Sequence, residues 1–150
     1  MPKPIYPGQT ISFLSQGTDD RTTIMVRNIP NKYTQRMLLD ELDIVHHGHY
    51  DFFYLPIDFK NRCNVGYAFI NFIHPLSIST FCKGFQGKRW TKFNSEKVCA
   101  VTYARIQGKR SMVERFQNSS LMGRNEDCRP MIFYTKGNLR GQPEPWTGKC

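Results

Sequence analysis

The sequence has no long hydrophobic run. A membrane-spanning helix needs roughly 18 consecutive apolar residues, whereas the mean hydropathy of this chain is −0.51 and its apolar stretches are short. The first twenty residues also contain no apolar segment of the kind found in secretory signal peptides. We therefore expect a protein that is neither inserted in a membrane nor exported.

Closely spaced cysteines are absent as well. Five cysteines and four histidines occur, but no two cysteines have the spacing of about two to four residues that is typical of zinc knuckles and ribbons. We expect no metal site and no other cofactor. An odd number of cysteines without an export signal favours free thiols, and we expect Cys82 and Cys99 to act as small core residues.

Acidic side chains are outnumbered by basic ones. The chain has 21 Lys and Arg against 12 Asp and Glu, which gives a net charge of +9 and a pI near 9.5. Residues 22–105 carry eleven basic and six acidic side chains, and residues 106–150 carry eight and four. Such an excess favours a polyanionic partner, and the lack of membrane features points to nucleic acid.

A chain of 150 residues suits one domain with a single core and terminal extensions. Residues 1–21 contain three prolines, two glycines and no hydrophobic periodicity, which predicts a flexible linker. Residues 22–105 are predicted to form the core, followed by an extension over residues 106–135 with a helix and a short extended segment. Residues 136–150, with three glycines and two prolines, are predicted to form a mobile tail.

Hydrophobic patterning in the core predicts alternating strands and helices. Strands are predicted over residues 22–29, 50–57, 65–72 and 97–104. One helix is predicted between Thr34 and Gly48, a second after Pro75, and a third, amphipathic helix over residues 108–121. The apolar face of the first helix is expected to consist of Leu38, Leu42 and Val45. The order βαββαβ predicts an α+β fold, with two helices on one face of a four-stranded antiparallel sheet.

The third predicted strand places aromatic side chains on the uncovered face of the sheet. Alternation directs Ala68, Ile70 and Phe72 into the core. It sends Val65, Tyr67, Phe69 and Asn71 to the opposite face. Two exposed rings on one strand are costly unless something covers them. Stacked nucleic-acid bases would do so, and each is worth about 1 to 3 kcal/mol.

This strand carries a known motif. The segment VGYAFINF, residues 65–72, resembles the RNP1 octamer of RNA recognition motifs (RRMs) at seven of its eight positions, counting the free one. The family usually has Lys or Arg at the first position, where this chain has Val65. We therefore expect Lys60 or Arg62, in the preceding loop, to supply the phosphate contact.

The first strand matches the companion motif. Residues 24–29, IMVRNI, resemble the RNP2 hexamer, with Met25 where an aromatic residue is usual. Arg27 lies on the same outward face, where its guanidinium can stack on or pair with a base. The fourth strand ends in Tyr103-Ala104-Arg105, which resembles the usual exit of the family, where backbone and Arg contact RNA.

Longer runs resemble the C-terminal RRM of the Mei-two-like proteins, which regulate meiosis and development in fungi and plants. These runs are RTTIMVRNIPNKYT, YDFFYLPIDFKNRCNVGYAFINF, FNSEKVCAVTYARIQGK and FQNSSLM. The resemblance implies a fragment of a larger, three-RRM protein that acts on single-stranded RNA, including noncoding RNA, in the nucleus and the cytoplasm. It also implies that the extension after Arg105 belongs to the domain.

Two other function classes are weighed against RNA binding. An RRM-like protein-interaction module would have its sheet face covered, here by the third helix, although such modules usually lose their sheet-face aromatics. An enzyme of acylphosphatase type would need a glycine-rich anion loop before the first helix, and residues 30–33, PNKY, contain no glycine. No nucleophile and base have a supporting spacing, so we expect no enzyme.

The residues expected to contact RNA lie on the sheet face, at the strand ends and in the loop after the second strand. They are Met25, Arg27, Asn28, Tyr54, Lys60, Arg62, Tyr67, Phe69, Asn71, Tyr103 and Arg105. The expected partner is single-stranded RNA, and a protein partner is left open.

Overall fold

The computed structural model of the chain describes residues 19–117 and 128–146. Expectations for residues 1–18, 118–127 and 147–150 fall outside this range. The described elements, in chain order, are β1 (Thr23–Arg27), α1 (Gln35–His46), β2 (Tyr50–Tyr54), β3 (Ile57–Asp58), β4 (Cys63–Asn64), β5 (Tyr67–Phe72), α2 (Leu76–Phe85), β6 (Ala100–Tyr103), α3 (Lys109–Phe116), β7 (Met131–Phe133), the 3-10 helix η3 (Gly137–Leu139) and β8 (Pro143–Glu144).

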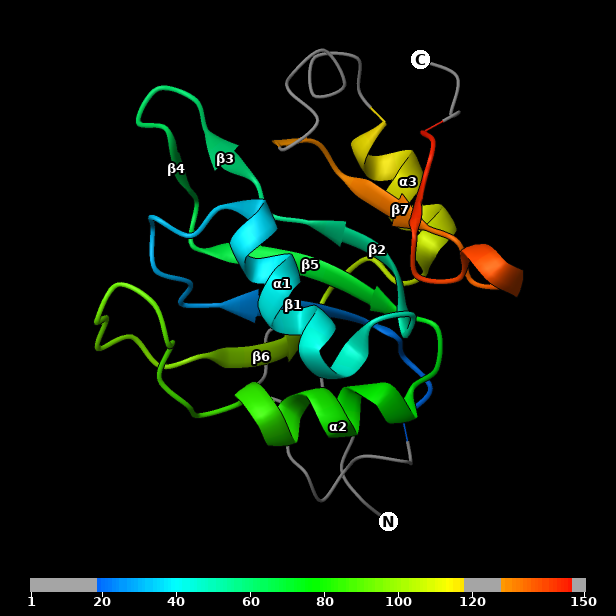
Figure 1. Cartoon of the computed structure of the whole chain (residues 1–150), viewed down its shortest axis with the longest axis horizontal. Helices are drawn as coiled ribbons and strands as arrows, with labels where there is room; N and C mark the ends of the chain where they lie inside the picture. The colour runs from blue at the N-terminus through cyan, green and yellow to red at the C-terminus, as the bar shows by residue number, and fades with distance from the viewer. Residues whose placement is uncertain (1–18, 118–127, 147–150) are drawn as a thin grey trace.

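The predicted βαββαβ order is confirmed by β1, α1, β2, β5, α2 and β6. All neighbouring strands pair antiparallel, in the sheet order β6-β1-β5-β2-β7-β8, and the short hairpin β3–β4 occupies the predicted loop between β2 and β5. Helices α1 and α2 lie on one face of the sheet, whereas α3 lies behind it (Figure 1). The α+β fold is therefore as expected, with a third helix on the second face.

The core between the sheet and helices α1 and α2 follows the predicted patterning with one exception. Leu38 and Leu42 are buried, but Val45 is 58% exposed, so its predicted place on the buried face is wrong. His46 takes that place, with its ring against Phe72 and Phe81 at centroid distances of 5.7 and 5.6 Å. Burial lowers the pKa of His46 to about 4, and the neutral imidazole therefore belongs to the core.

The thiols predicted to be small core residues are indeed buried. Cys82 and Cys99 are 0% and 2% exposed, and burial raises the pKa of each to about 12. Both are free cysteines. They therefore pack as apolar side chains, as the sequence predicted.

The sheet is wider than the four strands expected. β7 pairs with β2 through Phe52↔Ile132 and Phe53↔Met131, and β8 pairs with β7. The described part of residues 136–150 is therefore folded, which corrects the expectation of a mobile tail. The physical reason is that β2 would otherwise present an unpaired edge, which β7 and β8 cover with backbone hydrogen bonds.

The added strands also contribute to the main core. The ring of Phe133 meets Tyr50 edge to face at a centroid distance of 4.8 Å, and only 3% of Phe133 is exposed. Residues 106–146, where described, thus complete the hydrophobic core. This agrees with the expectation that the extension belongs to the domain.

We expect Phe133→Ala to lower the free energy of unfolding by about 3 to 5 kcal/mol, because it opens a cavity against Tyr50. Leu139→Ala, at a side chain that is 47% exposed, is the control and should change stability little. Urea denaturation of both variants measures the difference. A fragment of residues 22–107 as stable as the full chain would contradict this role of the extension.

Candidate nucleic-acid interface

The sheet face away from α1 and α2 presents the side chains that the two motifs predicted. Met25 and Arg27 of β1 lie directly across from Phe69 and Tyr67 of β5. The rings of Tyr67 and Phe69 meet edge to face at 5.6 Å. Both rings are partly exposed and Arg27 is exposed, so an accessible aromatic surface lies next to a cation at the Arg27 end of β1.

Helix α3 covers the β2 half of this face. The ring of Phe116 packs against Phe52, Tyr54 and Phe69 at centroid distances of 6.1, 5.0 and 5.5 Å. Tyr54 is consequently only 4% exposed, and burial raises the pKa of its hydroxyl. The prediction of Tyr54 as an open stacking ring is therefore corrected, because the apolar side of α3 needs an apolar surface to cover.

A groove of about 610 Å³ lies between α3 and the exposed half of the sheet. Its floor contains Met25, Tyr67 and Phe69, and one wall is formed by Met112 and Phe116 of α3. The other lining residues are Arg27, Tyr54, Pro56, Thr102, Tyr103, Ala104, Arg105, Ile106 and Arg115. Its volume lies within the roughly 300 to 1,000 Å³ that is typical of small-ligand pockets.

Three arginines line the groove. Arg27 stands at the end of β1, Arg105 follows β6, and Arg115 lies on α3. All three are exposed, and none is paired with a carboxylate within residues 19–117 and 128–146. Arg115 was missed from the sequence, although its position directly before Phe116 on an amphipathic helix was the signal that could have found it.

Asn71 lies on the predicted face but is not available to a ligand. It is 4% exposed, and its Oδ1 accepts hydrogen bonds from the hydroxyls of Thr22 and Thr23, at 2.8 and 2.7 Å. Its Nδ2 donates to Asp51 Oδ1 at 2.8 Å. Burial raises the pKa of the Asp51 carboxyl, and the Asn71 amide opposes that rise. The prediction of Asn71 as a base-reading residue is therefore corrected to a structural one.

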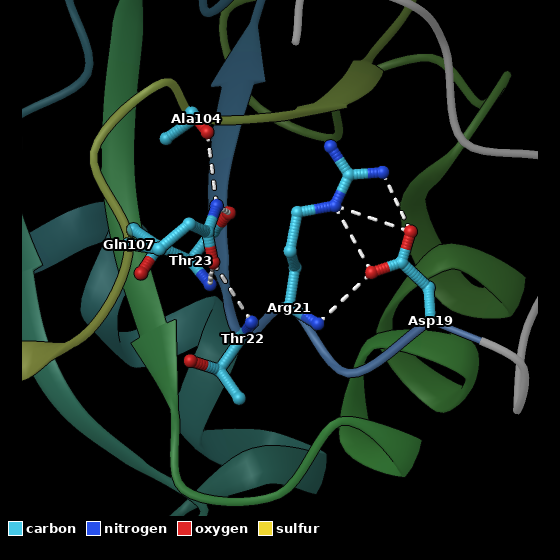
Figure 2. A network of polar contacts seen from close by, with 6 residues as sticks. All are labelled: Asp19, Arg21, Thr22, Thr23, Ala104 and Gln107. Carbon is cyan, nitrogen blue, oxygen red and sulfur yellow. Dashed lines mark hydrogen bonds and ion pairs between the residues drawn. The ribbon is translucent and has the colours of Figure 1, made fainter. Parts of the chain in front are cut away.

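Gln107 holds the chain that leaves β6 against the start of β1 (Figure 2). Its Oε1 accepts from the backbone N–H of Thr22 and Thr23, and its Nε2 donates to the carbonyls of Thr23 and Ala104, all at 2.9 to 3.0 Å. Gly108 then turns the chain with φ +94°, and its N–H donates to Thr23 Oγ1 at 2.7 Å. Helix α3 starts directly afterwards, so this network sets where the groove wall stands.

Tyr103 is also corrected. Its side chain points to the helix-covered face and is 3% exposed, because Tyr103 pairs with the core residue Ile24 in the register. The guanidinium of Arg21 lies over its ring at 4.0 Å from the centroid, and Figure 2 shows Asp19 holding that guanidinium. Burial raises the pKa of Tyr103 to about 12. The tyrosine side chain therefore belongs to the core, although Tyr103 also contributes to the lining of the groove next to Arg105.

The remaining predicted residues lie at the ends of the strands. Asn28 is exposed, and its Nδ2 donates to the carbonyl of Val98 at 3.1 Å. Lys60 and Arg62 are exposed on the turn of the β3–β4 hairpin, which projects from the sheet (Figure 1). The structure places neither cation in the lining of the groove, so their phosphate contact stays a prediction.

Comparison with known proteins identifies the family. The family model described as RNA recognition motif 2 matches residues 21–117. The chain belongs to this family. The RRM is 57% identical to Protein MEI2-like 2 of Oryza sativa over 133 residues and 54% identical to Meiosis protein mei2 of Schizosaccharomyces pombe over 133 residues, with 89% of this chain covered in both. It is an RRM of the Mei2-like family, and it spans only 16% and 18% of the length of these two relatives.

One solved structure with a similar fold is the Rna15 RRM with bound RNA (GU). Its TM-score is 0.47 at 19% identity, covering 64% of this chain and 97% of that chain. RRMs of this family are RNA-binding domains, and the expectation of a non-enzymatic domain is confirmed by the family match.

Two further features of other protein classes are lacking among the described residues. No helix there is both long and apolar enough to span a membrane. No cluster of three or more His, Cys, Asp or Glu side chains there is arranged to hold a metal ion.

Asn71→Ala should destabilise the RRM by about 2 to 3 kcal/mol, because it leaves the hydroxyl of Thr23 and the carboxyl of Asp51 without their buried partner. Thermal or urea denaturation measures this loss. Asn138→Ala, at an exposed site, is the matched control. Wild-type stability of Asn71→Ala combined with weakened RNA binding would instead restore Asn71 as a base-reading residue.

Proposed function

We propose that this RRM binds single-stranded RNA in the groove between α3 and the β1–β5 half of the sheet. Bases stack on Tyr67 and Phe69, and the phosphates contact Arg27, Arg105 and Arg115. The observation that carries the proposal is the coincidence, in one groove, of an open aromatic floor and three arginines that form no ion pair with any described residue. Rings of this kind accept any base, and the cations add affinity that depends on salt.

The groove favours a single strand over a duplex. Stacking on Tyr67 and Phe69 needs base faces that are free, and these are available only where bases are unpaired. The wall formed by α3 further narrows the access to the floor. A single strand with unstacked bases fits this geometry, whereas an intact double helix presents only base edges and phosphates.

The biological role of the parent protein is proposed from its relatives. We propose that the parent protein regulates meiosis or development, acts in both nucleus and cytoplasm, and takes noncoding RNA among its ligands. The support is the 54% identity to Meiosis protein mei2. The groove itself accounts only for the capture of RNA.

A protein-interaction module is the second candidate. It is favoured by the contacts of Phe116 with Phe52, Tyr54 and Phe69, which show α3 already covering half of the sheet face. Selection from a random single-stranded RNA pool separates the two. Tight binding of the selected RNA, compared with a scrambled RNA and with the same sequence as DNA, supports RNA as the ligand, whereas failure to enrich any RNA favours a protein.

Tyr67→Ala should weaken binding of the selected RNA by about 1 to 3 kcal/mol, because one stacking ring is lost from the floor. Tyr67 has few buried contacts to lose, since it is partly exposed at the start of β5, so the fold should remain intact. Fluorescence anisotropy titration measures the affinity, and circular dichroism checks the fold. Unchanged affinity in the folded variant would rule out the floor as the stacking surface.

Arg115→Ala should weaken binding and reduce the slope of log affinity against log salt by about 0.7, as expected when one phosphate contact to a single strand is removed. Arg110→Ala is the matched control, because Arg110 lies on the same helix, pairs with Glu114 and does not line the groove. Titrations at several salt concentrations measure both slopes. If both substitutions reduced affinity and salt slope equally, the effect of Arg115 would be one of overall charge and the contact in the groove would be ruled out.

A further inference from the structure

A second hollow lies at the edge of the sheet where β1 ends and β6 begins. Its volume is about 330 Å³, and the loops before α1 and before β6 form its walls. The lining residues are Pro30, Asn31, Lys32, Phe93, Ser95 and Lys97. None of them belongs to the groove beside α3.

The side chain of Phe93 is unusually placed for an aromatic residue. It is 49% exposed, and its backbone has φ 64°, followed by Asn94 with φ 47°. A bulky side chain in the left-handed region is unfavourable, and the exposed ring adds a hydration cost. The Phe93 ring makes an edge-to-face contact with the Tyr33 ring at a centroid distance of 5.8 Å. The contact with Tyr33 therefore positions the ring but leaves about half of the residue exposed.

The charge around the ring is mainly basic. Lys32 and Lys97 line the hollow, both are exposed, and neither forms an ion pair in the part of the chain that the structure describes. Arg89 donates to the carbonyl of Ser95 and so fixes the loop. Glu96 is the acidic residue of this loop and lies between two lining residues. Two lysines beside a ring suit a phosphate and its base better than an apolar peptide.

One hydrogen bond joins a neighbour of the groove lining to a neighbour of the hollow lining. Arg27 lines the groove, and the next residue, Asn28, donates its side-chain N–H to the carbonyl of Val98. Val98 follows Lys97, which lines the hollow. A strand that continues past Arg27 toward the hollow would therefore cross this hydrogen bond.

We propose that this hollow is a second RNA subsite, in which Phe93 stacks one nucleotide beyond those on the sheet while Lys32 and Lys97 contact its phosphates. The inference rests on the proposed function, because it extends the same RNA strand. It predicts that affinity grows when the RNA is lengthened past the Arg27 end of the groove. It also predicts that the gain depends on Phe93.

The test compares two lengths of the RNA selected from the random pool. The short form is trimmed to about four nucleotides, enough for the two or three bases that a sheet face stacks, and the long forms carry further nucleotides at the 5′ or the 3′ end. We expect one long form to bind wild-type protein about tenfold more tightly than the short form. Phe93→Asn should remove that gain and leave the short form unaffected, because asparagine tolerates the left-handed backbone but has no ring.

Charge and fold have their own controls. Lys32→Ala with Lys97→Ala should reduce the gain, whereas Lys83→Ala, on the exposed side of α2, should not. Phe93→Asn should unfold at the same urea concentration as wild type. If it does not, the binding experiment is repeated with Phe93→Gly, which also adopts the left-handed backbone without strain. A length gain that survives loss of the ring, or no gain in wild type, overturns the subsite.

The two proposals fail in different ways. If Tyr67→Ala leaves the affinity of the short form unchanged, the groove proposal is wrong. If Tyr67→Ala weakens both forms equally while Phe93→Asn changes neither, the groove stands and the subsite is wrong. Both proposals are supported if Tyr67→Ala weakens binding of the short form and Phe93→Asn removes only the gain in affinity from lengthening the RNA.

Discussion

The hydrogen bonds of Gln107 are the constraint on which the shape of the binding face depends. One side-chain amide satisfies the backbone N–H groups of Thr22 and Thr23 and two carbonyls, and thereby ties residues 104–108 to the sheet. Buried backbone groups left without such partners would each cost roughly 1 to 3 kcal/mol. The chain therefore leaves β6 along a single path, and α3 begins above Thr23 and Asn71.

With its start held in this way, α3 has one apolar surface within reach. Met112 and Phe116 pack on Phe52 and Tyr54 of β2, while Ile132 of β7 closes the same cluster from the side. Helix α3 therefore behaves as a wall fixed at its N-terminus, and Lys109 adds an ion pair with Glu144 of β8. The added strands thus support the helix as well as covering the edge of β2.

Much of the fold was predictable because it depends on local patterns. Alternation in residues 65–72 correctly separated Ala68, Ile70 and Phe72 in the core from Tyr67 and Phe69 on the opposite face, and the order of elements predicted the four strands β6, β1, β5 and β2. The errors at the candidate site concern Asn71, Tyr54 and Tyr103, whose surroundings are set by contacts with residues far along the chain. Alternation places Asn71 and Tyr54 on the outward face, yet Asn71 is hydrogen-bonded to Thr23 and Asp51, which lie 48 and 20 residues earlier, and Tyr54 is covered by Phe116 of the C-terminal extension. No pattern within a strand carries that information.

The composition of the groove follows from the same arrangement. The segment that resembles RNP2 has Met25 in place of the usual ring, and α3 covers Tyr54, so among the described residues the floor of the groove has Tyr67 and Phe69 as its aromatic residues. Two stacking rings supply limited binding free energy. Helix α3 offsets this loss, because the turn that places Phe116 over Tyr54 also places Arg115 at the groove beside Arg27 and Arg105. The net charge of +9 is therefore partly concentrated where a stacked strand needs its phosphates neutralised.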